Sequence, residues 1–281
     1  MSIFRNEKFT TVMYLVLSFI LGLCIFFCSL LSALKFTVFS PSYLTDTLNS
    51  TDYYKDLCAE ITDDLLNIGD ASGLDKSFFD DFIDEVLVRK DVQYYIDDFY
   101  AGNKLKVNSS DFQKSLRSAL DRYINKKNLT DKDFSEESLN KFVKEADKIY
   151  VSHIELTYFS QIQKAFLKYS FKINIYIGIT LAVIIAIILL FIFTNKWKHK
   201  AIRYIYYAAA SAGLVTLIIP IIVFLSGIIS KITIISRSLN DLYTACLSSV
   251  FITLIFIGGA LIAISGFLWV LHNKMRKNVS N

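Results

Sequence analysis

The chain contains few of the residues that form turns, disulfides and metal sites. Its 281 residues include 2 prolines, 10 glycines, 4 cysteines and 3 histidines. This low proline and glycine content excludes collagen-like and low-complexity sequences. Three cysteines lie in apolar runs and only Cys58 lies in the polar part of the chain, so no disulfide can form within that part. The spacing of the cysteines matches no zinc motif.

Four stretches lack Asp, Glu, Lys, Arg and His altogether: 9–34, 173–195, 204–230 and 242–271. Each is long enough for a helix to cross a hydrocarbon layer of roughly 30 Å. Residues 35–172, by contrast, hold 43 of the 56 charged side chains. This division excludes a simple soluble enzyme and a disordered chain. It predicts an all-α integral membrane protein, with four transmembrane helices and an α-helical extracytoplasmic domain between the first and second spans.

The basic residues indicate which side of the membrane each connection faces. The N-terminus (1–8), the 196–203 loop and the tail (272–281) are net positive, whereas residues 35–172 hold 24 acids against 19 bases. Connections rich in Lys and Arg stay in the cytoplasm. Both termini are therefore expected to be cytoplasmic in a plasma-membrane protein, with 35–172 and the 231–241 loop outside. The long first apolar run lacks a cleavage site, which favours an uncleaved span over a signal peptide.

Within residues 35–172, apolar side chains recur at helical spacing and predict a bundle of five or six helices. Pro41 is placed to occupy the first helical position after Ser40. The face formed by Tyr54, Leu57, Ile61 and Leu65 predicts a helix that ends at Gly69.

Further helix ends are predicted from capping residues. Asp75 and Asp91 are expected to cap the next two helices, the second of which ends at Gly102, and Asn108 to open the one after. No glycine or proline follows until Gly178. The last helix, from Glu136, could therefore continue into the second span, with a break near 157–160 as the alternative.

Acidic residues are concentrated in the first half of the 35–172 segment. Residues 35–103 hold 15 acids and 5 bases, whereas residues 104–172 hold 9 acids and 14 bases. The pattern fits an acidic surface for a cation or a basic partner, but two halves that pack together and complement each other are favoured. If the domain has an acidic contact surface, we expect it at Asp80, Asp81, Asp84 and Glu85.

The motifs of the common catalytic and metal sites are missing. The chain contains no nucleophile elbow, phosphate-binding loop or dinucleotide fingerprint. A calcium loop starting at Asp64 fails because Leu66 and Ile68 cannot ligate, and His153 lacks the cysteine pair of a zinc deaminase. We therefore expect no catalytic residue, cofactor or metal. An enzyme with an unfamiliar site remains a weaker alternative.

The apolar runs contain packing signals but no ionisable group other than Cys and Tyr, which argues against proton-coupled transport. Ala209 with Gly213, and Gly259 with Ala263, are small-residue pairs that let helices approach closely. Pro220 is expected to kink the third span, with Thr216 covering the freed carbonyl. These features suit a self-contained four-helix bundle or a docking face for another membrane protein.

Two resemblances follow from the sequence and the order of its parts. Phe39-Ser40-Pro41-Ser42-Tyr43-Leu44 and Ser50-Thr51-Asp52-Tyr53-Tyr54 resemble segments of four-span membrane proteins of low-GC Gram-positive bacteria, a group that has no assigned activity. The span order is similar to that of ABC permeases of the cell-division and macrolide-export type. That likeness implies a cytoplasmic ATPase partner, but the 196–203 loop leaves little room for a coupling helix.

The leading hypothesis is a non-enzymatic multi-pass membrane protein whose extracytoplasmic domain serves binding, sensing or assembly at the cell envelope. Its expected partners are the lipid bilayer and other membrane or envelope proteins, and self-association stays open. The alternative is a permease-like subunit that couples a cytoplasmic ATPase to the outer domain. The net charge of +4 follows from the topology and does not indicate nucleic-acid binding.

Overall fold

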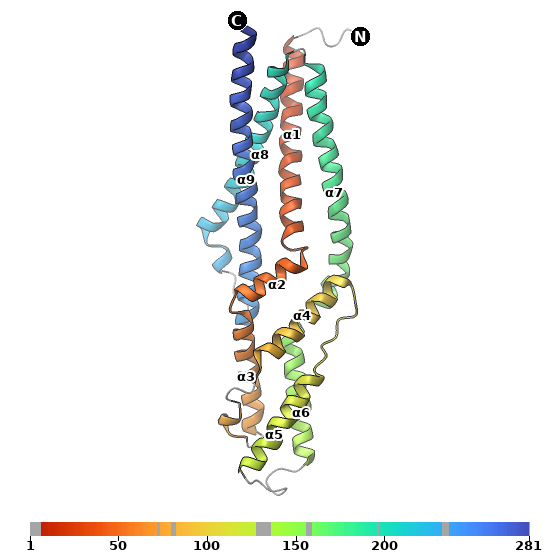
Figure 1. Cartoon of the computed structure of the whole chain (residues 1–281), viewed down its shortest axis with the longest axis vertical. Coiled ribbons are helices and arrows are strands. Elements are labelled where there is room, and N and C mark those ends of the chain that lie inside the picture. Colours follow the sequence, from red (N-terminus) through yellow and green to blue (C-terminus); the bar gives the residue numbers. More distant parts are fainter. Residues whose placement is uncertain are drawn as a thin grey trace. The chain divides into compact units, whose positions relative to one another are not determined.

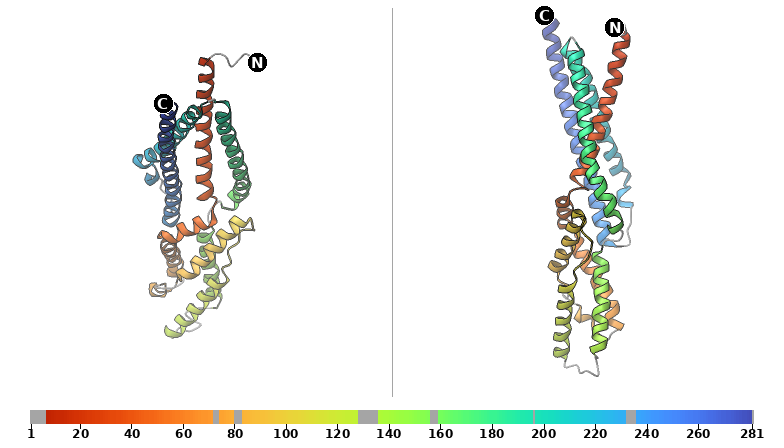
Figure 2. Two further views of the ribbon diagram at one scale, coloured as in Figure 1. Left: turned by 45° about the horizontal axis from the view of Figure 1, so that its top comes forward. Right: turned by 90° about the vertical axis from the view of Figure 1, so that its right-hand side faces the viewer.

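The structure is a computed structural model that describes residues 7–71, 74–79, 83–127, 136–155, 159–195, 197–231 and 236–280. Throughout these ranges its regular secondary structure is helical (Figures 1 and 2). The chain divides into two compact units, which we call the span unit and the head unit. The span unit comprises Met1–Ser40, Tyr169–Ile232 and Cys246–Asn281; the head unit comprises Pro41–Lys168 and Thr233–Ala245.

The structure contains four segments that are long and apolar enough to cross a membrane: Phe9–Phe36, Glu136–Thr194, Lys198–Ser226 and Arg237–Lys277. They include the helices α1 (Glu7–Phe36), α7 (Phe159–Thr194), α8 (Lys198–Ser226) and α9 (Arg237–Ser280). In the most apolar stretch of each segment only 6% to 33% of the residues are buried, so most of its side chains are not packed against other parts of the protein. The predicted helical fold with four candidate spans is confirmed, and it is consistent with a membrane protein.

The span unit is held together by close packing of α1 against α8. The aromatic ring of Tyr14 lies 5.3 Å from that of Tyr204 and 5.9 Å from that of Phe191, between centroids. The buried Ser18 hydroxyl donates a 2.7 Å hydrogen bond to the carbonyl oxygen of Tyr204. Gly22 permits this approach, because a Cβ atom there would lie 2.8 Å from the Ser211 hydroxyl oxygen.

Small residues also bring α8 and α9 together, although only part of the predicted set is involved. Ala209 and Gly213 are buried, and a Cβ atom on Gly213 would lie 3.2 Å from the Gly258 carbonyl oxygen. A Cβ atom on Gly259, by contrast, would have no atom within 4 Å, and Ala263 is exposed. The second small residue of this crossing is therefore Gly258, one position from the predicted Gly259.

Pro220 lies inside α8, as the sequence requires. The Thr216 hydroxyl, however, donates a 2.7 Å hydrogen bond to the carbonyl oxygen of Ala212. The carbonyl that loses its partner at Pro220 is that of Thr216 itself, four residues earlier. The expectation that the Thr216 side chain covers it is therefore wrong: a threonine hydroxyl in a helix reaches back toward the preceding turn.

The head unit contains α2 (Pro41–Ser50), α3 (Tyr53–Ala71), the short 3₁₀ helix η2 (Lys76–Phe78), α4 (Glu85–Ala101), α5 (Ser110–Lys127) and α6 (Glu136–Ile154). The first turns of α7 and α9 belong to it as well. Its core is formed by side chains that recur at helical spacing on α3, α4, α5 and α6. They include Leu57, Ile61, Leu65, Phe112, Leu116, Leu120, Phe142, Ala146 and Tyr150.

Two predicted helix ends in this unit are wrong. α3 continues past Gly69 to Ala71, and a Cβ atom on Gly69 would lie 2.2 Å from the Phe79 ring. This glycine therefore makes room for an aromatic ring and does not end a helix. Asp91 caps nothing, because α4 already begins at Glu85, where the Asp84 carboxylate accepts a 2.9 Å hydrogen bond from the Val86 amide.

Other predicted ends agree with the structure. α2 begins at Pro41, and α4 ends at Gly102, whose φ of 76° lies in the left-handed region. The predicted cap at Asp75 is only partly confirmed: Asp75 occupies the N-cap position of the three-residue η2, but its side chain forms no capping hydrogen bond. α6 ends at Ile154 and α7 begins at Phe159. Of the break predicted near 157–160, residues 157 and 158 lie outside the described residues, and residues 159 and 160 belong to α7.

Candidate functional site: a carboxylate junction at the start of α9

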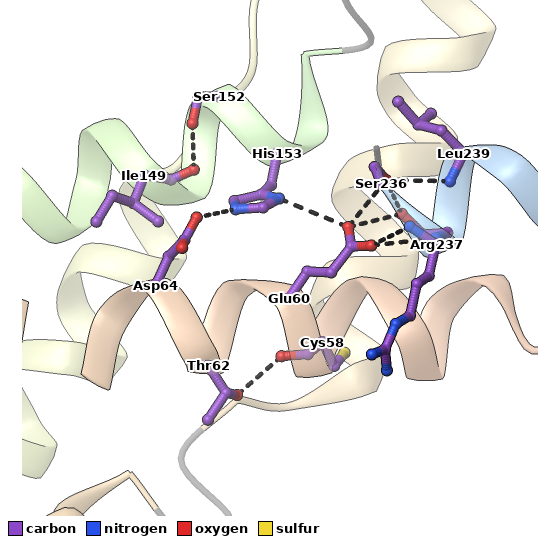
Figure 3. A network of polar contacts seen from close by, with 11 residues as sticks. Cys58, Glu60, Thr62, Asp64, Ile149, Ser152, His153, Ser236, Arg237 and Leu239 are labelled. Atoms are coloured by element: carbon purple, nitrogen blue, oxygen red, sulfur yellow. Dashed lines mark hydrogen bonds and ion pairs between the residues drawn. The ribbon is translucent and has the colours of Figure 1, made fainter. Parts of the chain in front are cut away.

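The Glu60 side chain from the middle of α3 caps the N-terminus of α9. Its carboxylate accepts hydrogen bonds from the backbone amides of Arg237 and Ser238, the first two residues of α9. The Ser236 and Ser238 hydroxyls each donate a further hydrogen bond to it, at 3.0 Å (Figure 3). An anion at this position satisfies amides that have no partner within the helix and interacts favourably with the helix dipole.

This carboxylate is well shielded from water. Its side chain is 19% exposed, and Ser238, which donates two of its bonds, is fully buried. Each bond joins an ionised acceptor to a neutral donor, an arrangement stronger than a bond between two neutral groups. We refer to Glu60, Asp64, His153, Ser236 and Ser238 as the Glu60 junction.

His153 connects this junction to α6. Figure 3 shows its imidazole directed toward α3, between Asp64 and Glu60. Its Nε2 atom lies 2.8 Å from Oδ2 of Asp64, and its Nδ1 atom lies 4.0 Å from Oε2 of Glu60. His153 is 20% exposed, so it packs at a helix interface, as expected from its position on the apolar face of α6.

A second pair of side chains joins α3 to α9 one turn away. The Asp56 carboxyl lies beside the Asp241 carboxyl, and two acids side by side favour a proton on one of them. Partial burial, followed by the neighbouring Asp241 carboxyl, raises the pKa of Asp56 above its usual range. This second contact is therefore favoured at low pH and weakened as the pH rises.

A cavity of about 340 Å³ opens beside the junction. Its lining is almost entirely polar and consists of Asp56, Ala59, Glu60, Asp63, Asp64, His153, Ser236 and Arg237. Among the described residues, no group of three or more His, Cys, Asp or Glu side chains is arranged to hold a metal ion. The arrangement joins three helices through charge-assisted hydrogen bonds, and its strength depends on the protonation state of its acids.

The four predicted contact residues do not belong to this junction. Asp80 and Asp81 lie outside the described residues. Asp84 caps α4, and the Glu85 carboxylate forms a 2.8 Å ion pair with Arg89, which also lies over the Tyr54 ring. The described half of the predicted acidic surface is thus already engaged within the domain.

The acidic and basic halves of the domain do pack together. Asp75 of the first half pairs with Lys127 of the second at 2.7 Å. Lys90 and Asp111 form the reverse pair at 3.1 Å. The described ion pairs thus join the two halves once in each direction, and mutual complementation of the charges stays a prediction.

The sequence contained one unused signal for the junction. Ser236-Arg237-Ser238 directly precedes the fourth apolar run, a pattern typical of a helix N-terminus. It could have located the start of α9, but not the partner Glu60, which lies 178 residues from Ser238. No protein-family model, curated protein or solved structure matches the chain.

Proposed function

We propose that this chain is a multi-pass membrane protein whose head unit binds a component of the cell envelope and transmits its bound state to the membrane through α9. The observation behind this role is the capping of α9 by Glu60. α9 begins in the head unit, and from Cys246 onward it belongs to the span unit. A movement of α3 or α6 that displaces Glu60 or His153 therefore acts on the first turn of a candidate transmembrane helix.

The distribution of charge supports an outward-facing head unit. The 196–203 loop contains Arg203 and other bases but no acid, and the tail adds Lys274, Arg276 and Lys277. By the positive-inside rule these segments are cytoplasmic, which places residues 35–172 outside. The function is then binding or sensing without catalysis, in a plasma membrane.

The orientation is tested by labelling intact cells with a membrane-impermeant maleimide. All four native cysteines are replaced by alanine, and a single cysteine is introduced at the exposed Lys141 or Lys274. Labelling of Lys141→Cys in intact cells, with labelling of Lys274→Cys only after permeabilisation, is the expected result. The opposite pattern would invert the topology and exclude an envelope ligand.

The binding role is tested by affinity purification of the tagged full-length chain from its own membranes after light crosslinking. Envelope proteins or glycans recovered with the head unit are expected, and Glu60→Ala should retain them, because Glu60 transmits the bound state and does not form the contact. Stoichiometric recovery of a cytoplasmic ATPase would replace this proposal by the permease-like role.

A further inference from the structure

The head unit contains a second cavity, of about 370 Å³, between η2, α4, α5 and α6. Its volume lies at the lower end of the range of about 300–1,000 Å³ that small-molecule sites occupy. Its lining includes large apolar and aromatic residues, which the lining of the junction cavity lacks apart from His153. Such a cavity with a few convergent polar groups has the composition of a site for a small organic molecule.

The apolar wall of this cavity contains two pairs of packed aromatic rings. Phe112 and Tyr150 stack face to face with centroids 4.0 Å apart and an interplanar angle of 6°, and both are buried. Phe78 and Tyr123 form an edge-to-face pair at 5.4 Å. The hydroxyls of both tyrosines already have partners, since Tyr150 donates to Asp91 and Tyr123 accepts from the Asp75 amide. Phe112 and Tyr150 have almost no exposed surface, so the ring that an occupant can reach is the half-buried Tyr123.

The polar side of the cavity is cationic. Arg122 and Lys126 line it from successive turns of α5, and both are exposed. Among the described residues, neither forms an ion pair with a carboxylate. The one acid in the lining, Asp84, uses its carboxylate to cap α4. A guanidinium and an ammonium one turn apart are well suited to a carboxylate, sulfate or phosphate group.

From this pairing we infer that the cavity binds a small organic anion, with an apolar ring or chain against Leu87 and Tyr123 and its acidic group at Arg122 and Lys126. This inference names the class of ligand that the proposed sensing role would detect. The effect of binding on α9 rests on that proposed role. The consequence follows from α6: Tyr150 forms the cavity wall, and His153, three residues later, contacts Asp64 of the Glu60 junction. An occupant that displaces Tyr150 therefore acts on the junction.

The test uses the full-length protein in lipid nanodiscs and phenylbutyrate as the probe, with uncharged phenylbutanol as its matched neutral control. Binding is measured by calorimetry and by saturation-transfer NMR. We expect phenylbutyrate to bind, and R122E/K126E to weaken binding about ten-fold or more by replacing attraction with repulsion. The matched control is K141E/K144E, two exposed lysines of α6 outside the lining, which should bind as the wild type does.

A second variant probes the apolar half without changing charge. Ala119→Trp places a large ring in the cavity that Ala119 lines and should abolish binding while α5 stays helical. Equal binding of phenylbutyrate and phenylbutanol, or wild-type affinity in R122E/K126E, would overturn the inference. The proposed coupling is read separately, as a change in amide exchange of residues 237–242 on adding the probe. Binding without that change would leave the site standing and overturn only the sensing role.

Discussion

The Tyr150 hydroxyl of α6 donates a 2.7 Å hydrogen bond to the carboxylate of Asp91, in the middle of α4. Asp91 is 7% exposed, and burial raises its pKa, an effect partly offset by this hydrogen bond and by the charge of Lys90. A carboxylate inside a helical bundle is costly unless a donor satisfies it. The two residues therefore fix α4 against α6 beside the aromatic wall of the proposed ligand cavity.

Removing the donor should destabilise the head unit more than removing the charge. We expect Tyr150→Phe to lower the free energy of unfolding by about 1.5–3 kcal/mol, because the Asp91 carboxylate then stays buried without its donor. Asp91→Asn keeps an acceptor for the hydroxyl and removes the charge, so it should cost less. Urea unfolding followed by circular dichroism compares the variants, and equal losses for both would contradict this account.

A second prediction concerns the dependence of stability on pH at the Asp56–Asp241 pair. Because the pKa of Asp56 is raised in the folded protein, folding takes up a proton there. Its contribution to stability is complete below the ordinary aspartate value of about 3.9 and is lost as the pH rises through the raised pKa. Asp56→Asn should therefore become more stable relative to the wild type as the pH increases from about 4.

This comparison requires unfolding curves of both proteins over a series of pH values. The double variant D56N/D241N should gain little beyond D56N alone, because either change removes the repulsion between the carboxyl groups. A difference between D56N and the wild type that stays constant with pH would show that the pair is not coupled in solution.

A third prediction separates two adjacent glycines of α9. A Cβ atom on Gly258 would lie 3.0 Å from the Leu217 backbone nitrogen, whereas one on Gly259 would meet nothing within 4 Å. Gly258→Leu should therefore force α8 and α9 apart and destabilise the span unit by about 1–3 kcal/mol. Gly259→Leu makes the same chemical change on the neighbouring face and should leave stability close to that of the wild type. Thermal unfolding in detergent measures both, and equal effects would exclude this crossing.

The sequence predicts the fold where the periodicity of apolar residues is long and uninterrupted. The four charge-free runs lie in long helices, and the face of Leu57, Ile61 and Leu65 is buried as predicted. The periodicity of apolar residues cannot predict whether Gly258 or Gly259 contacts α8. Gly259 with Ala263 fits the small-residue motif, whereas Gly258 has Leu254 and Ile262 four residues away. The rotation of α9 against α8 nevertheless turns Gly258 toward the neighbour.

The misassigned caps have a different physical cause. Asp91 and Gly69 belong to the residue types that commonly begin and end helices, but tertiary contacts determine their roles. Asp91 is retained inside α4 because Tyr150 donates to it, and Gly69 is required because the Phe79 ring occupies the space of a side chain. Both partners lie outside the local window on which a capping prediction depends. The same applies to Glu60 and Ser238, which only the fold brings together.

The fourth prediction tests the capping of α9 by Glu60. Glu60→Ala removes a charged acceptor from two helix amides and two serine hydroxyls, and it should destabilise the first turn of α9 by about 1–2 kcal/mol. Glu60→Gln keeps one oxygen acceptor and should show a smaller loss. Asp63→Ala is the matched control, because Asp63 lies on the same helix and lines the same cavity without contacting α9 in any described hydrogen bond.

Amide hydrogen exchange of the full-length protein provides the measurement. Exchange at Arg237 and Ser238 should accelerate about five- to thirty-fold in Glu60→Ala, the rate change that corresponds to the expected loss if these amides exchange through local opening. It should stay near the wild-type rate in Asp63→Ala. Unchanged protection in Glu60→Ala would mean that α9 does not depend on α3 for its first turn. The transmission of a bound state from the head unit to α9 would then lose its physical basis, whatever ligand the domain binds.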